Sequence, residues 1–126
     1  MKKTVYVLGN PLVNIDNLPL KLLPQLKKNY PEFSFIHFDP TEELTQADRN
    51  LIFIDTVIGI KKVTTFNDLN RWSISPRFTV HDFDLPINLK ILQKLGKIKK
   101  ITIIGVPKKG NQKKILKEIK NLLKSI

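Results

Sequence analysis

Apolar residues cluster in four short runs along the chain, and the pattern within each run predicts a buried β-strand. The runs are rich in β-branched and aromatic residues, stay mostly apolar instead of alternating, and end at turn-forming or acidic residues. They cover residues 4–8, 33–38, 50–54 and 100–106. The first run is the expected central strand. A shorter run at residues 63–66 follows the third too closely for a helical crossover, which favours an antiparallel edge strand.

Between these runs, leucines and isoleucines recur at the spacing of one helical face. This spacing predicts helices over residues 17–29, 85–95 and 112–126. In the first of them, Asn17 stands where an N-cap is expected. Pro24 lies in the middle of the same helix, where it removes a backbone hydrogen bond and clashes with the preceding turn. We therefore expect a kinked or two-piece helix there.

Strands that alternate with amphipathic helices indicate the fold class. Because the strands are apolar on both sides, the sheet must be covered on both faces, as in mostly parallel sheets. The sequence predicts a single α/β domain over residues 1–126, with three layers (α/β/α) and a twisted sheet of about five strands. Right-handed crossovers would bring the carboxyl ends of the parallel strands to one edge.

The composition narrows the possible chemistry. The chain has 126 residues and no cysteine, which excludes a disulfide framework, a thiolate zinc site and a cysteine nucleophile. Any metal ligands must come from His, Asp or Glu. Residues 5–8 are too short an apolar run for a signal-peptide core, and no run approaches membrane-spanning length. We expect a cytoplasmic, soluble protein.

The formal net charge of +11 is distributed unevenly. Residues 1–84 carry equal numbers of acidic and basic side chains, whereas residues 85–126 hold twelve lysines and a single acid, Glu118. A basic segment of this kind is typical of a solvated helical face, and it is also compatible with nucleic-acid binding. Of the 22 basic residues 19 are Lys, so the bidentate contacts that Arg makes with bases are scarce and nucleic acid is the weaker alternative.

Three polar residues stand just after predicted strands or just before a predicted helix. Asp16 follows the first strand, Asp55 ends the third, and His81 precedes the helix at residues 85–95. Ligands of open α/β sheets bind at the carboxyl ends of the strands, where this topology would gather the three side chains. Two carboxylates and one imidazole suit nickel or zinc. Alternatively, Asp16 caps the next helix and His81 is a surface group.

Other residues are weaker candidates for a functional site. His37 falls within a predicted strand, which favours a structural role at a packed face. Asp82 could orient His81, and Trp72 is equally compatible with packing and with partner contact. Gly9 lacks the further glycines of a dinucleotide-binding loop, and the sequence contains no Gly-x-Ser-x-Gly elbow.

An ordered set of short motifs resembles a known family. The motifs are Gly9-Asn10-Pro11-Leu12 followed by Asp16, then Leu51-Ile52-Phe53-Ile54-Asp55, then Ser75-Pro76 with His81-Asp82, and finally Ile103-Ile104-Gly105-Val106-Pro107. Spanning residues 4–107, this set is similar to that of the [NiFe]-hydrogenase maturation proteases, and it implies a phosphorylase/hydrolase-like fold. The chain departs from the family pattern around Asp16, where Ile15 precedes the acid and Asn17-Leu18-Pro19 replaces a glycine-rich turn.

The resemblance implies a specific activity. Members of the family remove a C-terminal extension from the hydrogenase large-subunit precursor after nickel has been inserted. Carried onto this chain, their metal-binding residues are Asp16, Asp55 and His81, which would act both as metal ligands and in catalysis. The nickel would arrive with the precursor, and cadmium or zinc could replace it. The alternative is a noncatalytic metal-binding or interaction module on the same fold.

Overall fold

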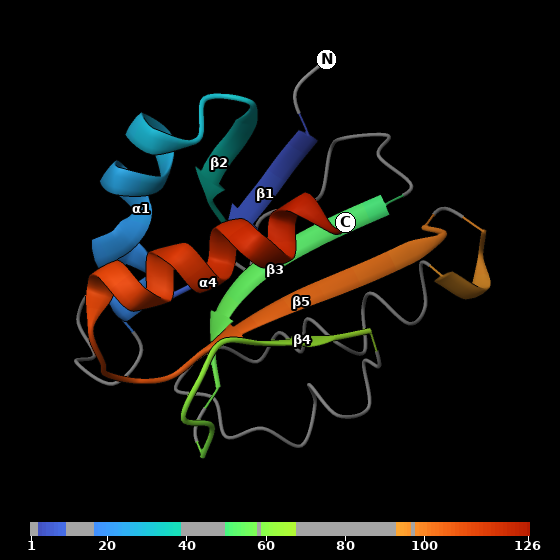
Figure 1. The fold of residues 1–126 in the computed structure, drawn as a ribbon. Coiled ribbons are helices and arrows are strands. Elements are labelled where there is room, and N and C mark those ends of the chain that lie inside the picture. The colour runs from blue at the N-terminus through green and yellow to red at the C-terminus, as the bar shows by residue number, and fades with distance from the viewer. Residues whose placement is uncertain (1–2, 10–16, 39–49, 58, 68–92, 97) are drawn as a thin grey trace.

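The computed structural model describes residues 3–9, 17–38, 50–57, 59–67, 93–96 and 98–126 (Figure 1). Its secondary structure follows the order predicted from the apolar runs. The elements are β1 (Lys3–Val7), α1 (Leu18–Asn29), β2 (Phe33–His37), β3 (Asn50–Thr56), β4 (Thr64–Phe66), β5 (Lys100–Val106) and α4 (Gln112–Lys124). The helix predicted at residues 85–95 lies almost entirely outside the described residues. Gly96, just past its predicted end, has a φ of 74°, as expected of a C-terminal cap.

In the described part of the chain, five strands form one sheet in the order β2-β1-β3-β5-β4. Neighbouring strands pair in parallel except β4, which pairs antiparallel to β5 at one edge. The predicted α/β class, the mostly parallel sheet and the antiparallel edge strand are therefore confirmed. The expected central place of the first strand is wrong, because β3 is the middle strand. Six of the seven residues of β3 are buried, as expected of a middle strand, and β3 pairs with β5 along its full length.

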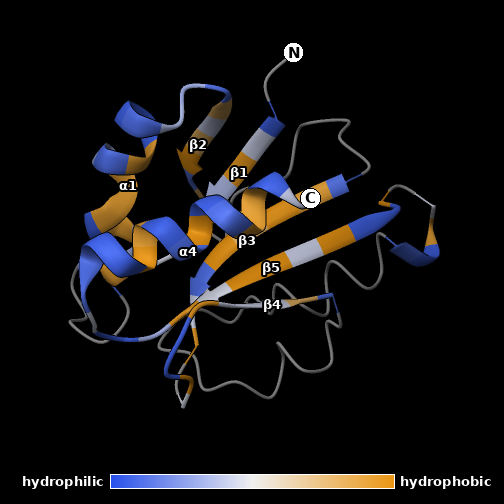
Figure 2. Ribbon diagram, in the orientation of Figure 1, coloured by the Kyte–Doolittle hydropathy of each residue, from blue (hydrophilic) through white to orange (hydrophobic). Residues whose placement is uncertain are grey.

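Apolar side chains are buried on both faces of the sheet. On one face α1 and α4 pack over the strands, and Leu22, Leu26 and Ile119 are fully buried there. On the other face Tyr6, Phe53 and neighbouring apolar side chains form a second buried cluster. Figure 2 shows the hydrophobic strands beneath helices whose outer sides are hydrophilic. Burial on both faces explains why the strands are apolar throughout.

Helix α1 continues through Pro24 as one helix instead of two. Pro24 is on the exposed side, while Leu18, Leu22 and Leu26 bury the opposite side against the sheet. Burial of each large leucine side chain contributes about 1.5–3 kcal/mol, which together exceeds the cost of about 3 kcal/mol for an interior proline. Packing on the sheet therefore holds the helix together across the proline.

Among the residues that the structure describes, no helix is long and apolar enough to cross a membrane. The cytoplasmic location stays a prediction.

Replacement of Pro24 by Ala should stabilise the protein. The change restores a backbone donor in the middle of α1, and we expect the free energy of unfolding to rise by about 2 kcal/mol after the smaller loss from a more flexible unfolded chain. Urea unfolding followed by circular dichroism measures this change, with Gln25→Ala on the same exposed side as the control. An unchanged or lower stability of Pro24→Ala would show that the proline fits the helix without cost.

Candidate active site at the carboxyl edge of the sheet

The parallel register brings the ends of four strands to one edge of the sheet (Figure 1). Val7 at the end of β1 is paired with His37 on one side and with Ile54 on the other. Ile54 is in turn paired with Ile104 of β5. The residues that follow these positions therefore lie side by side along the edge, as expected for a ligand crevice of an α/β sheet.

Asp55 is the predicted site residue that the structure describes. It is the second-last residue of β3, which continues two residues beyond the predicted end of the strand, and its side chain is only 6% exposed. Its Oδ1 accepts a hydrogen bond of 2.9 Å from the backbone N–H of Thr56. A buried carboxylate costs several kcal/mol unless hydrogen bonds or a counter-charge compensate it. Asp55 is thus a buried acid held at the edge where ligands bind.

Gly105 stands opposite Asp55 in the β3–β5 register. A Cβ atom at this position would lie 2.7 Å from Cε2 of Phe66 and 2.8 Å from Cγ2 of Val57. Both distances are shorter than carbon atoms tolerate, so only a residue without a side chain allows Phe66 and Val57 to approach β5 here. The packing beside Asp55 therefore depends on this glycine.

Thr56, the next residue, turns its side chain to the opposite face of the sheet, because neighbouring residues in a strand alternate. It is 5% exposed, and its Oγ1 has no hydrogen-bond partner among the residues that the structure describes. Such a group loses its hydration without replacement, which makes it destabilising by about 1–3 kcal/mol. Thr56 is a feature of the edge that the sequence pattern did not single out.

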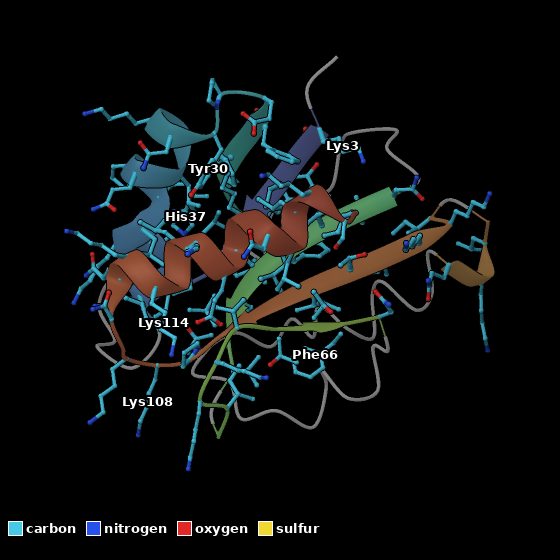
Figure 3. All side chains as sticks on the ribbon, viewed as in Figure 1. Lys3, Tyr30, His37, Phe66, Lys108 and Lys114 are labelled. Carbon is cyan, nitrogen blue, oxygen red and sulfur yellow. The ribbon has the colours of Figure 1, made fainter. Side chains whose placement is uncertain are left out.

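His37, labelled in Figure 3, lies at the end of β2 on the same edge, and the strand order places it on the side of β1 away from Asp55. The sequence placed it at a packed face, and this interpretation is wrong because His37 is exposed at the very end of β2. Its Nε2 lies 3.3 Å from the carbonyl oxygen of Gly9, whose φ of 155° is rare for other residue types. The imidazole thus links the end of β2 to the residues that follow β1.

The other predicted site residues, Asp16 and His81, lie outside the described residues, as do Trp72 and Asp82. Asn17, which follows Asp16 in the sequence, occupies the N-cap position of α1 with 9% exposure, although its side chain makes no capping hydrogen bond. Within the described ranges, no group of three His, Cys, Asp or Glu side chains could hold a metal ion. The described part of the edge therefore contributes one predicted metal ligand, Asp55.

Two solved structures of hydrogenase maturation proteases are similar in fold to this chain. The chain superimposes on the [NiFe] hydrogenase maturation protease HybD from Thermococcus kodakarensis with a TM-score of 0.70 and 18% identity, over 99% of both chains. For the hydrogenase maturating endopeptidase HybD from E. coli the TM-score is 0.62 with 20% identity, over 85% of this chain and 74% of that one. The chain has the fold of the [NiFe]-hydrogenase maturation proteases.

A third similar structure is an uncharacterized protein from Wolinella succinogenes, with a TM-score of 0.53 and 17% identity over 92% of this chain and 79% of that one. No protein-family model matches the sequence, and no curated protein matches it. The structural match thus confirms the fold that the ordered motifs implied, at sequence identities of 17% to 20%.

Replacement of Gly105 by Ala should destabilise the protein by about 1–3 kcal/mol, because the new methyl group overpacks the space shared by Phe66 and Val57. Thermal unfolding measures the effect. Gly110→Ala is the matched control, since a Cβ there would lie 3.2 Å from the flexible Cδ1 end of Ile115. Equal melting temperatures for the two variants would contradict the close packing beside Asp55.

Replacement of Thr56 by Val should raise the free energy of unfolding by about 1 kcal/mol, because a methyl group of similar size replaces a buried hydroxyl that has no partner in the described part of the chain. Thr64→Val provides the opposite case, since the Thr64 hydroxyl donates to the carbonyl of Lys62 at 3.0 Å. Denaturant unfolding compares both variants. If Thr56→Val is the less stable of the two variants, the Thr56 hydroxyl makes a hydrogen bond in solution.

Proposed function

We propose that this protein is an endopeptidase that removes the C-terminal extension of a [NiFe]-hydrogenase large-subunit precursor after nickel has been inserted. One observation carries the proposal. A buried acid, Asp55, stands at the carboxyl end of the middle strand in a fold that matches a maturation protease over 99% of both chains. The same acid belongs to the motif set that resembles the family.

The nickel ion is part of the substrate in this proposal. Asp16, Asp55 and His81 complete the coordination of the precursor-bound nickel, and their oxygen and nitrogen donors suit this metal. The bound ion would polarise the carbonyl of the scissile peptide. Asp55 is prepared for the ligand role, because the hydrogen bond from the Thr56 N–H fixes the orientation of its carboxylate.

The same donors would serve a second candidate function, a noncatalytic module that binds the metal or the precursor without cleaving it. This candidate rests on the changed sequence around Asp16, where Asn17 begins a helix with proline in its first turn. The two functions share the fold and the ligand set. They differ in whether the precursor loses its tail.

Incubation of the protein with nickel-loaded precursor tests the proposal. We expect the wild-type protein to shorten the nickel-loaded precursor and to leave the nickel-free precursor intact, as followed by mass spectrometry. Asp55→Asn keeps the size of the side chain but removes its charge, so the cleavage rate should fall at least roughly 100-fold because several kcal/mol of transition-state stabilisation are lost.

Glu32→Gln is the matched control, because it makes the same acid-to-amide change at an exposed position after α1. It should cleave at the wild-type rate. Full activity of the Asp55→Asn variant would show that Asp55 is not part of the active site. If the wild-type protein binds the nickel-loaded precursor and leaves the tail in place, the noncatalytic module is the function.

A further inference from the structure

Four lysines form a row along one flank of α4. The row consists of Lys113, Lys117, Lys120 and Lys124, which follow one another at intervals of three or four residues and are all exposed. At 1.5 Å per residue the row extends about 16 Å. The apolar side of the helix is buried on the sheet through Ile115, Ile119 and other residues. The lysine row is therefore fixed in place by the packing of α4.

The contacts of α4 show which way the lysine row faces. The Tyr30 hydroxyl, just after α1, donates to the carbonyl oxygen of Leu116 at 3.4 Å, and Nζ of Lys120 lies 5.7 Å from the centre of the Tyr30 ring. The row thus lies on the flank next to α1. On the other flank, Oε2 of Glu118 accepts a hydrogen bond of 3.0 Å from the backbone N–H of Val63.

Within the described ranges, the charge of the lysine row is not compensated by acidic side chains. Glu118 is the only acidic residue of α4, and its carboxylate is engaged with Val63 on the opposite flank. Among the described residues, no ion pair involves the row. Like charges three or four residues apart in a helix destabilise it. An anionic partner would relieve this repulsion, so the row is a surface that gains from binding negative charge.

The lysine row begins next to the candidate active site. Exposed Lys108 and Lys109 lie in the connection between the carboxyl end of β5 and α4, and Figure 3 shows Lys108 projecting away from the fold there. At the far end, Lys124 lies near the C-terminus, where Nζ of Lys3 donates to the carbonyl oxygen of Ile126 at 2.9 Å. The row therefore leads from the edge that holds Asp55 across the helical layer.

We propose that the lysine row, extended by Lys108 and Lys109, is a docking surface for an acidic segment of a partner protein. The inference rests on the proposed function, in which that partner is the precursor whose tail reaches the edge at Asp55. A protein partner is favoured over nucleic acid for two reasons. The row contains no Arg for bidentate base contacts, and the aromatic side chains of the described residues are buried or half-buried and offer no stacking surface.

A triple variant and a matched control test the docking surface. Lys113→Gln/Lys117→Gln/Lys124→Gln removes three charges from the row and leaves Lys120 on the Tyr30 ring. Lys94→Gln/Lys99→Gln/Lys100→Gln removes three exposed charges elsewhere. Fluorescence anisotropy with labelled poly-L-glutamate should show affinity reduced about tenfold by the first variant and less than about twofold by the second, since three exposed ion pairs are lost only in the first.

Two results of this binding experiment would overturn the proposal. Equal losses in the two triple variants would show that binding depends on total charge and not on the row. The second result is tighter binding of a labelled 20-base-pair DNA duplex than of poly-L-glutamate. If only the row variant, Lys113→Gln/Lys117→Gln/Lys124→Gln, then loses affinity for the DNA, the surface binds nucleic acid. In the expected case, affinity for poly-L-glutamate also falls steeply with salt.

Kinetics with the nickel-loaded precursor separate docking from chemistry. The row variant should raise KM about tenfold and leave kcat unchanged, because docking contacts are present equally in ground and transition states. The control triple variant should keep both constants. A reduced kcat with unchanged KM would overturn the docking role. If the wild-type protein cleaves no precursor, the endopeptidase proposal fails, while the poly-L-glutamate experiment still decides whether the row binds acidic chains.

Discussion

The parallel pairing of β3 with β5 is the constraint on which the candidate site depends. The register continues from Asn50 to Thr56 without a break, so Asp55 is held inside the sheet up to its carboxyl edge. Gly105, directly opposite, leaves room for Phe66 and Val57 to close over β5. A carboxylate in this position gives up most of its hydration, and it is retained at an edge where it can interact with a charged ligand. The same pairing thus stabilises the sheet and positions the acid.

Much of the fold could be predicted because it follows from local patterns. β5 has the predicted bounds, α4 begins at the predicted residue, and β4 is antiparallel because the chain before it is too short for a crossover. These features depend on β-branched runs, helical spacing and turn residues within short segments. The place of Asp55 at the carboxyl end of an apolar strand was predictable for the same reason, although β3 continues through Asp55 to Thr56.

Features that depend on distant contacts were not predictable from the sequence. The central place of β3 comes from pairing with β5, a strand that begins 44 residues beyond its end. Pro24 stays within one helix because the leucines of α1 pack on the sheet, and His37 is exposed because β2 ends there, beside Gly9. The gathering of Asp16 and His81 with Asp55 likewise depends on the whole fold, and it stays a prediction.

The proposed function requires Asp55 to share one divalent ion with Asp16 and His81. Anomalous diffraction from a crystal of the protein soaked in nickel or cadmium tests it most directly. We expect a single strong peak within bonding distance of a carboxylate oxygen of Asp55, an oxygen of Asp16 and an imidazole nitrogen of His81. A peak elsewhere, such as at the exposed His37, with none beside Asp55, would contradict it.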